Sequence, residues 1–469
     1  SEDTKQRFLD KMWTGEWSGT MALTEPSAGS DVGDMLSKAF PTDEPGIYRI
    51  KGNKCFITGG EQDFTDNIIH LMLARIEGAA PGTGGISLFA VPKMWVEADG
   101  SVSGDNDVSC AGIEHKMGIR GSATCVMNFG EDNRCRGFLL GEPPDENGKA
   151  RGMAQMFNMM NGARLEMGVG STAGSAVAYH NAVQYSVGRI QGKTMANPKA
   201  GRQPIIKHED VRRMLLDQKA HIEVMRALVC RAYYYMDILE NTADPEERKI
   251  CQWKLNILTP ICKAYNSDMA WILTAEAMQC YGGYGYSEEY PIAQLCRDVK
   301  IHSIWEGTNY IQAISTVARS WGLGKGQAME AWLAEISDFI AAQSGNQEFG
   351  REIVLLQKGL DSYKALRMSI VEAAMGGNPS IMGIYATRIT HASAKLYGGF
   401  LVLEQAVLAA QKAAAVGEGH FDYAFYIGKT QSAKYYLRNI VPDIWDLQAK
   451  IEAYDSSVLD IPEEAFTLL

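Results

Sequence analysis

Hydrophobic and polar positions along the chain follow two successive patterns, and the first is typical of β-strands. From about residue 20 to 140, short apolar runs alternate with turn residues. The runs Ile47–Ile50 and Cys55–Thr58 flank Lys-Gly-Asn-Lys, which predicts a hairpin turn at 51–54. Further strands are predicted at 67–76, 85–91 and 124–129. Because these strands follow one another without intervening helices, we expect an antiparallel sheet or barrel and no βαβ unit.

From about residue 151 the apolar spacing becomes helical. One face is formed by Leu165, Val169, Ala173, Ala176, Val183 and Val187, and another starts with Met214, Ile222, Met225 and Val229. A loop at Pro204 separates these helices, and a third is predicted at 246–280 with a kink or break at Pro260. The later helices are predicted from Thr308 to about 322 and at 355–375, 386–414 and 422–454. The pattern predicts an α+β protein, with a β domain followed by helical segments.

Composition indicates an ordinary globular protein with an acidic balance. Of 469 residues, 46% are hydrophobic and 22% charged, and 45 Lys plus Arg against 56 Asp plus Glu give a net charge of −11. This balance argues against nucleic-acid binding through phosphates. No apolar run approaches the length of a membrane span, and the N-terminus lacks a signal-peptide pattern. We therefore expect no nucleic-acid partner and no membrane association.

The cysteines and histidines argue against a metal site. The nine cysteines form no C-x-x-C pair, and the eight histidines show no H-E-x-x-H or similar cluster. Several cysteines, such as Cys125 and Cys230, adjoin apolar residues, so we interpret them as core residues in a reducing compartment. The predicted location is cytoplasmic, or the mitochondrial matrix if the protein is eukaryotic.

One acid stands out in the stretch HSIWEGTNYIQ, residues 302–312. Glu306 follows Ile304 and Trp305 and precedes a helix that the Thr308 hydroxyl is predicted to cap. Such an acid can simply favour a helix start through the dipole, or it can be a partly desolvated base. Burial would raise its pKa and the helix terminus would lower it, so the sequence leaves the sign open.

Two further stretches also have both a plain and a functional interpretation. The segment MALTEPSAGSD, residues 21–31, is a polar turn that can face water or hydrogen-bond a flat heterocycle. The segment QCYGGYGY, residues 279–286, can cap a helix or let the backbone approach a ligand closely. No strand–GxGxxG–helix unit occurs, so a nicotinamide-binding Rossmann domain is disfavoured.

The order of several motifs resembles the acyl-CoA dehydrogenase family over about residues 20 to 322. The motifs are LTEPSAGSD, FITGG (56–60), KMGIRGS (116–122), NGAR (161–164), GRIQGK (188–193), QCYGGYGYSEEYP and RDVKIHSIWEGTNYIQ. The chain is most similar to the long subgroup with an extra C-terminal helical domain, which includes the 3-methylmercaptopropionyl-CoA dehydrogenases. The resemblance implies a remnant of an N-terminal helical domain (1–20), a β domain (21–140), a four-helix bundle with the catalytic base (141–327) and a C-terminal helical extension (328–469).

The resemblance also implies a reaction. Glu306 matches the catalytic base, which removes the α-proton of an acyl-CoA thioester while the β-hydrogen leaves as hydride to FAD. The product is a trans-2-enoyl-CoA, and an electron-transferring flavoprotein takes up the electrons. A homodimer or homotetramer is expected, because Arg189 matches an arginine that reaches the FAD of a neighbouring subunit.

The remaining site residues are carried over from the same motifs. The residues expected to bind FAD are Met21, Leu23, Thr24, Gly29, Ser30, Phe56, Ile57, Thr58, Arg189, Gln279, Gly282, Gly283, Thr308 and Tyr310. The residues expected to bind substrate are Ser30, Asn161, Arg164 and Gly307.

The chain departs from the family pattern at four places. Phe56 replaces the usual Trp, Gly192 stands where an aromatic often follows Gln191, and Asn161 replaces the usual acidic partner of Arg164. Only about twenty residues precede the LTEP segment, where the family has a helical domain, so we expect a truncated protein, a lid supplied by another chain or an unusually open cleft.

Two other functions stay open at this point. An acyl-CoA oxidase differs only in the access of oxygen to the reduced flavin. A non-catalytic or nucleic-acid-binding member of the superfamily is the other alternative, against which Glu306 and the acidic balance argue.

Overall fold

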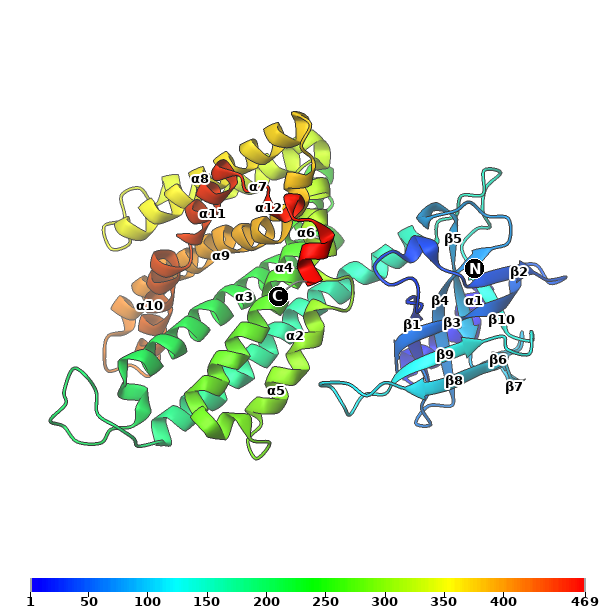
Figure 1. The fold of residues 1–469 in the computed structure, drawn as a ribbon, viewed down its shortest axis with the longest axis horizontal. Coiled ribbons are helices and arrows are strands. Elements are labelled where there is room, and N and C mark those ends of the chain that lie inside the picture. The colour runs from blue at the N-terminus through cyan, green and yellow to red at the C-terminus, as the bar shows by residue number, and fades with distance from the viewer. Residues whose placement is uncertain (1, 468–469) are drawn as a thin grey trace. The chain divides into compact units, whose positions relative to one another are not determined.

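The computed structural model describes residues 2–467, except the side chain of Asn158, and the chain forms two compact units, Ser1–Gly162 and Ala163–Leu469. The first unit contains the strands and the second is helical (Figure 1). The fold is therefore α+β, as predicted. The four-segment division stays a prediction about the sequence.

The first unit is built on an eight-stranded sheet in the order β1-β4-β5-β10-β3-β9-β8, with β2 pairing with β3 and β4. The strands are β1 (Trp17–Ala22), β2 (Lys38–Pro41), β3 (Ile47–Thr58), β4 (Asn67–Ile76), β5 (Ile86–Pro92), β8 (Val108–Ile113), β9 (Thr124–Phe129) and β10 (Arg136–Leu140). Most pairs are antiparallel, whereas β1 and β2 run parallel to β4. A separate ribbon consists of β6 (Met94–Val96) and β7 (Val102–Asp105), and helix α1 (Glu2–Thr14) precedes β1.

The predicted hairpin at 51–54 is wrong, because β3 continues through it. Gly52, Asn53 and Lys54 pair with β9, and Lys51 pairs with Lys38 of β2. A Cβ on Gly52 would lie 2.1 Å from the Ser37 Oγ, so the glycine serves close strand packing and not a turn. Tertiary pairing therefore overrides the local turn chemistry.

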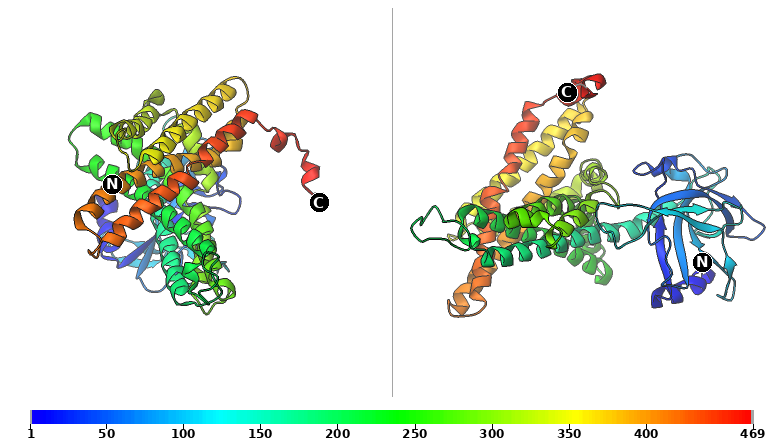
Figure 2. Two further views of the ribbon diagram at one scale, coloured as in Figure 1. Left: turned by 90° about the vertical axis from the view of Figure 1, so that its left-hand side faces the viewer. Right: turned by 60° about the horizontal axis from the view of Figure 1, so that its bottom comes forward.

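The second unit packs long helices around one apolar core. Its main helices are α2 (Gly152–Gly188), which starts in the first unit, α3 (Glu209–Asn241), α4 (Pro245–Tyr281), α5 (Ile292–Val299), α6 (Asn309–Ile314), α7 (Gln327–Ala342), α8 (Gly350–Met375), α9 (Ser380–Val416), α10 (Tyr423–Asn439) and α11 (Asp443–Ala453). The last helical pieces, α12 (Ser457–Asp460) and the turn Glu463–Thr467, leave the bundle and have no buried residue (Figure 2).

Two prolines act differently from the sequence prediction. Pro260 lies inside α4, which continues through it because this part of the helix is buried in the core. The predicted helix at 422–454 is instead two helices, since Pro442 follows the end of α10 and begins α11. A proline lacks the N–H and clashes with the preceding turn, which favours a break where packing does not enforce continuity.

The helices beyond residue 327 share their core with the bundle. Trp332 of α7 and Tyr397 of α9 are fully buried with Leu258 of α4 in one cluster. Helix α9 contacts α3, α4, α6, α8 and α10. Among the described helices, α9 is the one long and apolar enough to cross a membrane by length and composition. Its buried residues pack against these helices, as in a core helix.

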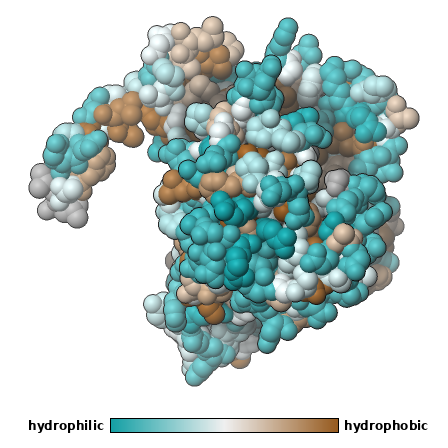
Figure 3. All heavy atoms as spheres, turned by 90° about the vertical axis from the view of Figure 1, so that its right-hand side faces the viewer, coloured by the Kyte–Doolittle hydropathy of each residue, from teal (hydrophilic) through white to brown (hydrophobic). Residues whose placement is uncertain are grey.

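Figure 3 shows a face on which hydrophilic residues predominate and hydrophobic ones are scattered. All nine cysteines are free thiols, and seven are buried. Cys230 is exposed, so its assignment to the core is wrong: it lies on the outer side of α3.

Candidate active site

Glu306 lies on a tight hinge between a short 3₁₀ turn, Lys300–Ser303, and helix α6. Its φ is 55°, in the left-handed region that non-glycine residues rarely adopt, and Gly307 follows with a φ of 83°. A Cβ on Gly307 would lie 2.8 Å from the Gln312 Nε2, which donates to the Gly307 carbonyl at 3.1 Å. The chain therefore keeps a strained backbone where it presents this acid.

The start of α6 is held by Asn309 and not by the predicted cap. Thr308 occupies the N-cap position, but its hydroxyl makes no capping hydrogen bond, so that prediction is wrong. Instead the Asn309 Nδ2 donates to the Asp268 Oδ1 at 2.7 Å and to the Ala264 carbonyl at 3.1 Å. Asn309 is buried, and its amide attaches the start of α6, and with it the hinge, to α4.

The carboxylate of Glu306 is desolvated. Its Oε2 is buried and has no hydrogen-bond partner among the described residues. Burial raises the pKa of Glu306 above its ordinary value, and the nearby positive charges of Lys263 and Arg164 act in the opposite direction. The pKa shift of Glu306, whose direction the sequence left open, is thus upward. Ile304 is 53% exposed, so of the two apolar neighbours only Trp305 is half-buried.

Arg164 approaches the hinge from α2. Its Nε donates to the Glu306 carbonyl oxygen at 3.4 Å. Burial lowers the pKa of Arg164, while the charge of Glu306 raises it. This arrangement places a cation beside the hinge without a hydrogen bond from this nitrogen to the carboxylate.

A second group of predicted residues lies at the other ends of the same helices. It contains Arg189, Gln279, Gly282 and Gly283, all of them exposed. The Arg189 guanidinium lies 5.9 Å from the centre of the Tyr284 ring. About 24 residues of continuous helix α2 separate Arg164 from its last residue, which corresponds to about 36 Å. The structure therefore does not bring Arg189 to the Glu306 hinge of its own chain.

The first unit carries a third group, in the segment 21–30 and at 56–58. A buried ion pair that sequence reasoning missed holds this group: the Lys54 Nζ lies 2.8 Å from the Glu25 Oε1, with side chains 0% and 3% exposed. The same Nζ donates to the Leu23 carbonyl at 3.0 Å, and the Thr24 carbonyl accepts from the Cys55 N–H at 2.9 Å. These contacts fix the segment 21–30 against β3. A lysine inside an otherwise turn-like tetrapeptide gave no local signal of this role.

Phe56 is turned outward by a bulge in β3. The register with β9 shifts between Lys54 and Ile57, and Phe56 has a φ of 60°. As a result Phe56 is 62% exposed, whereas Ile57 is 2% exposed and packs into the sheet core. Phe56 and Thr58 therefore present side chains at the surface of this unit, and Ile57 presents only its backbone.

Asn161 and Ser30 belong to the first unit, whereas Arg164 and Gly307 belong to the second. Asn161 is exposed on the first turns of α2, and Ser30 is exposed after Gly29. Two of the four residues predicted to bind substrate therefore lie in each unit.

Comparison with known proteins finds three matching family domains. The model of the acyl-CoA dehydrogenase middle domain matches residues 20–131, that of the acyl-CoA dehydrogenase C-terminal domain matches 150–321, and an acetyl-CoA dehydrogenase C-terminal-like domain matches 332–462. A butyryl-CoA dehydrogenase of Syntrophomonas wolfei is 48% identical over 465 residues, which are 99% of this chain and 76% of that protein. The chain belongs to the acyl-CoA dehydrogenase family.

Other acyl-CoA dehydrogenases match to a lesser extent. The 3-methylmercaptopropionyl-CoA dehydrogenase of Ruegeria pomeroyi is 42% identical over 320 residues, covering 68% of this chain and 52% of that protein. The solved acyl-CoA dehydrogenase of Bacillus anthracis, complexed with FAD, has a TM-score of 0.75 at 22% identity and covers 98% of this chain and 73% of that one. At this identity the second match shows the fold.

As an acyl-CoA dehydrogenase, the protein is an FAD-dependent oxidoreductase that dehydrogenates acyl-CoA. The expected family membership, enzyme class and cofactor are confirmed. The roles of the individual site residues stay predictions.

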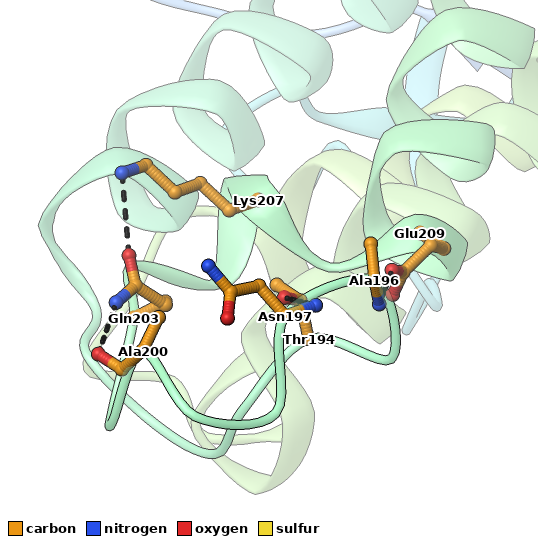
Figure 4. A pocket seen from close by; sticks show the side chains of 7 residues that line it. All are labelled: Thr194, Ala196, Asn197, Ala200, Gln203, Lys207 and Glu209. Atoms are coloured by element: carbon orange, nitrogen blue, oxygen red, sulfur yellow. Dashed lines mark hydrogen bonds between the residues drawn. The ribbon is translucent and has the colours of Figure 1, made fainter.

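A hollow of about 290 Å³ opens in the loop between α2 and α3 (Figure 4). Its polar groups bind one another: the Lys207 Nζ donates to the Gln203 Oε1 at 3.2 Å, and the Ala196 N–H donates to the Glu209 Oε1 at 3.0 Å. None of its lining residues is a predicted site residue of this dehydrogenase.

Proposed function

We propose that the protein converts an acyl-CoA thioester to the trans-2-enoyl-CoA, with Glu306 as the base that removes the α-proton. The supporting observation is the desolvated Glu306 carboxylate, with an unpartnered Oε2 and a raised pKa, on a strained hinge. A carbon-bound proton is weakly acidic, so its removal needs a base whose pKa approaches the working pH and a site that excludes water.

FAD, when bound, accepts the β-hydrogen as hydride. The first unit offers a surface that fits a flat ring, because Phe56 and Thr58 point outward beside the segment 21–30 that Lys54 and Glu25 anchor. We assign Met21, Leu23, Thr24, Gly29 and Ser30 to that surface as well. Phenylalanine retains the apolar face of the usual tryptophan without its N–H donor.

The substrate is proposed to be a short-chain acyl-CoA, with butyryl-CoA as the first candidate, because the relative that matches 99% of the chain is named a butyryl-CoA dehydrogenase. Arg164 is assigned to the CoA portion as a cation, together with Asn161 and Ser30. Gly307 is assigned to the thioester beside the base, since a side chain there would be strained at a φ of 83° and would crowd Gln312.

A second copy of the chain is proposed to complete each site. Arg189, Gln279, Gly282 and Gly283 are exposed at the far ends of α2 and α4, whereas Thr308 and Tyr310 adjoin Glu306. These two groups lie too far apart to hold one cofactor within one copy. A homodimer or homotetramer would let Arg189 reach the pyrophosphate of a neighbour's FAD through a charge-assisted contact.

The electron acceptor is proposed to be an electron-transferring flavoprotein rather than oxygen. Mixing the substrate-reduced enzyme with air in a stopped-flow instrument separates these acceptors. Slow reoxidation supports the dehydrogenase, and fast reoxidation with peroxide formation contradicts it. We also infer a cytoplasmic location, which the nine free thiols support because a reducing compartment keeps thiols unpaired.

Anaerobic titration with acyl-CoAs of increasing chain length tests the proposal. Loss of flavin absorbance with enoyl-CoA formation is expected, most completely with butyryl-CoA. No bleaching with any acyl-CoA would contradict the function, and bleaching only with long chains would contradict the substrate assignment.

A further inference from the structure

A buried lysine lies beside the proposed base. Lys263 of α4 is 0% exposed, and its Nζ donates to the Asn309 Oδ1 at 2.8 Å. The ion pairs within 4 Å among the described residues do not include one from Lys263, so its nearest bound partner is a neutral amide. An ammonium group in this position is costly unless it interacts with charges farther away.

Two residues of α4 hold the two ends of one amide. Lys263 donates to the Asn309 oxygen, and the Asn309 nitrogen donates to Asp268 at 2.7 Å. Since Asn309 follows Glu306 by three residues and begins α6, this double contact fixes the orientation of the helix that carries the hinge. The positive charge of Lys263 is also the first of the charges that hold down the pKa of Glu306 against burial.

The C-terminal extension takes part in the same network. The His391 Nε2 of α9 lies 3.0 Å from the Asp268 Oδ2, the oxygen that Asn309 does not use. The His391 ring also meets the Tyr265 ring edge-to-face, with centres 5.5 Å apart. A continuous chain of contacts therefore leads from α9 through Asp268 and Asn309 to the Glu306 hinge and to Lys263.

We propose that Lys263 is a positioning residue for Glu306, and that the C-terminal extension supports the same hinge through His391. The inference rests on the proposed role of Glu306 as the base. Lys263 acts in two ways: its contact with Asn309 orients the hinge, and its charge favours the ionised carboxylate. The extension thus contributes to catalysis by holding Asp268 and not by touching substrate.

Other charged groups face the same region and also act on the pKa values of Glu306 and Lys263. Arg164 acts on Glu306 in the same sense as Lys263, and Glu166 acts in the opposite sense. Asp268 raises the pKa of Lys263, whereas burial, the largest effect, lowers it to about 7. Burial and the Lys263 charge lower the pKa of His302, whereas the charge of Asp298 raises it. Lys263 is therefore the cation whose removal should change Glu306 most.

The first experiment measures the protonation of Glu306 directly. An infrared pH titration of the holoenzyme follows the carbonyl band of the protonated carboxyl, which is assigned by its absence in Glu306→Gln. In Lys263→Met the titration should move to higher pH by about 1 pH unit, as expected for loss of a close opposite charge. The acid limb of kcat/KM should move by the same amount, and Lys300→Met serves as the matched control without a shift.

An unchanged titration in Lys263→Met would overturn the proposal even if activity falls, because a purely structural role lowers activity without moving the titration. Lys263→Gln provides a second neutral variant if the methionine variant does not fold. The Glu306→Gln variant also separates the proposed function from the proposed role of Lys263. If Glu306→Gln keeps full activity, the proposed function fails, whatever effect Lys263 has on the Glu306 carboxyl.

A second experiment tests the extension. His391→Phe keeps an aromatic ring but removes the bond to Asp268, and we expect kcat to fall about 10-fold, the size of one lost, partly buried hydrogen bond, with KM unchanged. His391→Gln, which retains a donor, should recover most of kcat. Unchanged kcat in His391→Phe, or no recovery in His391→Gln, would contradict the proposal that the C-terminal extension supports the hinge.

Discussion

Arg164 and Glu306 are joined through the backbone: the Arg164 Nε donates to the Glu306 carbonyl oxygen at 3.4 Å, across 142 positions of sequence. This contact attaches the Glu306 hinge to α2. The buried Oε2 of the same glutamate keeps no hydrogen-bond partner among the described residues, which is the state expected of the proposed base.

Activity should depend on pH through Glu306. A base works only when ionised, and burial raises the pKa of Glu306 above the ordinary 4.5. The value of kcat/KM should therefore fall as the pH drops through this raised pKa. A pH–rate profile, measured with an acyl-CoA that dissociates faster than it reacts, locates this acid limb of kcat/KM. A limb at or below pH 4.5 would contradict the desolvated carboxylate.

Replacing the base by glycine should stabilise the protein while abolishing activity. Glu306 has a φ of 55°, which glycine adopts without strain, and the change also removes a desolvated carboxylate. Glycine gives the unfolded chain more conformational entropy, which lowers stability. The free energy of unfolding should still rise by about 1 kcal/mol at neutral pH, because the relief of strain is larger.

Chemical denaturation of Glu306→Gly beside the parent protein measures this gain. The matched control is Glu166→Gly, in the interior of α2, which should lose about 1 kcal/mol. A loss of stability in Glu306→Gly as large as in the control would show that the hinge is not strained.

The ion pair of Lys54 and Glu25 should support both folding and flavin binding. Lys54→Met leaves a buried carboxylate that accepts from the Leu36 and Ser37 N–H groups but lacks its cation. The free energy of unfolding should fall by about 3–5 kcal/mol, and FAD should bind more weakly.

Lys450→Met is the control for that variant, because the pair Lys450–Asp446 is exposed and should contribute less than about 1 kcal/mol. The double variant Lys54→Met with Glu25→Gln should recover part of the stability, since no unpaired charge remains. Equal effects of Lys54→Met and Lys450→Met would show that the buried pair does not hold the segment.

Arg189 should act on the cofactor of another copy. Arg189→Ala should weaken FAD binding by about 10-fold through loss of a charge-assisted contact. Mixed oligomers of Arg189→Ala and Glu306→Gln chains should regain activity, because one kind of site then has both residues. Absence of any recovery in oligomers shown to be mixed would show that Arg189 and Glu306 of one chain serve the same site, which contradicts the proposal.

The order of the motifs and the change from β-type to helical spacing could be read from the sequence. The contact partners of the residues within these segments could not. Strands β4 and β9 and helix α9 lie close to their predicted positions, because their periodicity reflects burial on one face or all round. The stretch 51–54 was misread as a turn, since the pairing of Gly52 with β9 is non-local. Pro442 divides a helix that apolar spacing alone predicts as continuous.

The candidate site was predictable only in part for the same reason. Glu306 was singled out by its motif, whereas its positive φ, its unpartnered oxygen and its contact with Arg164 arise from tertiary structure. Lys263 gave no signal, because a single lysine in an apolar helix is normally explained by a solvated face. Its burial against Asn309 is visible only once α4 and α6 are packed.

The central claim is most directly tested by single-turnover kinetics of Glu306→Gln. The holoenzyme is mixed anaerobically with butyryl-CoA, and the loss of flavin absorbance is followed beside Glu372→Gln, a change of an exposed acid on α8. If Glu306 is the base, flavin reduction in Glu306→Gln is slowed by about 10²–10⁴-fold or more while FAD stays bound, with Glu372→Gln unaffected. Flavin reduction at the parent rate in Glu306→Gln would contradict this role.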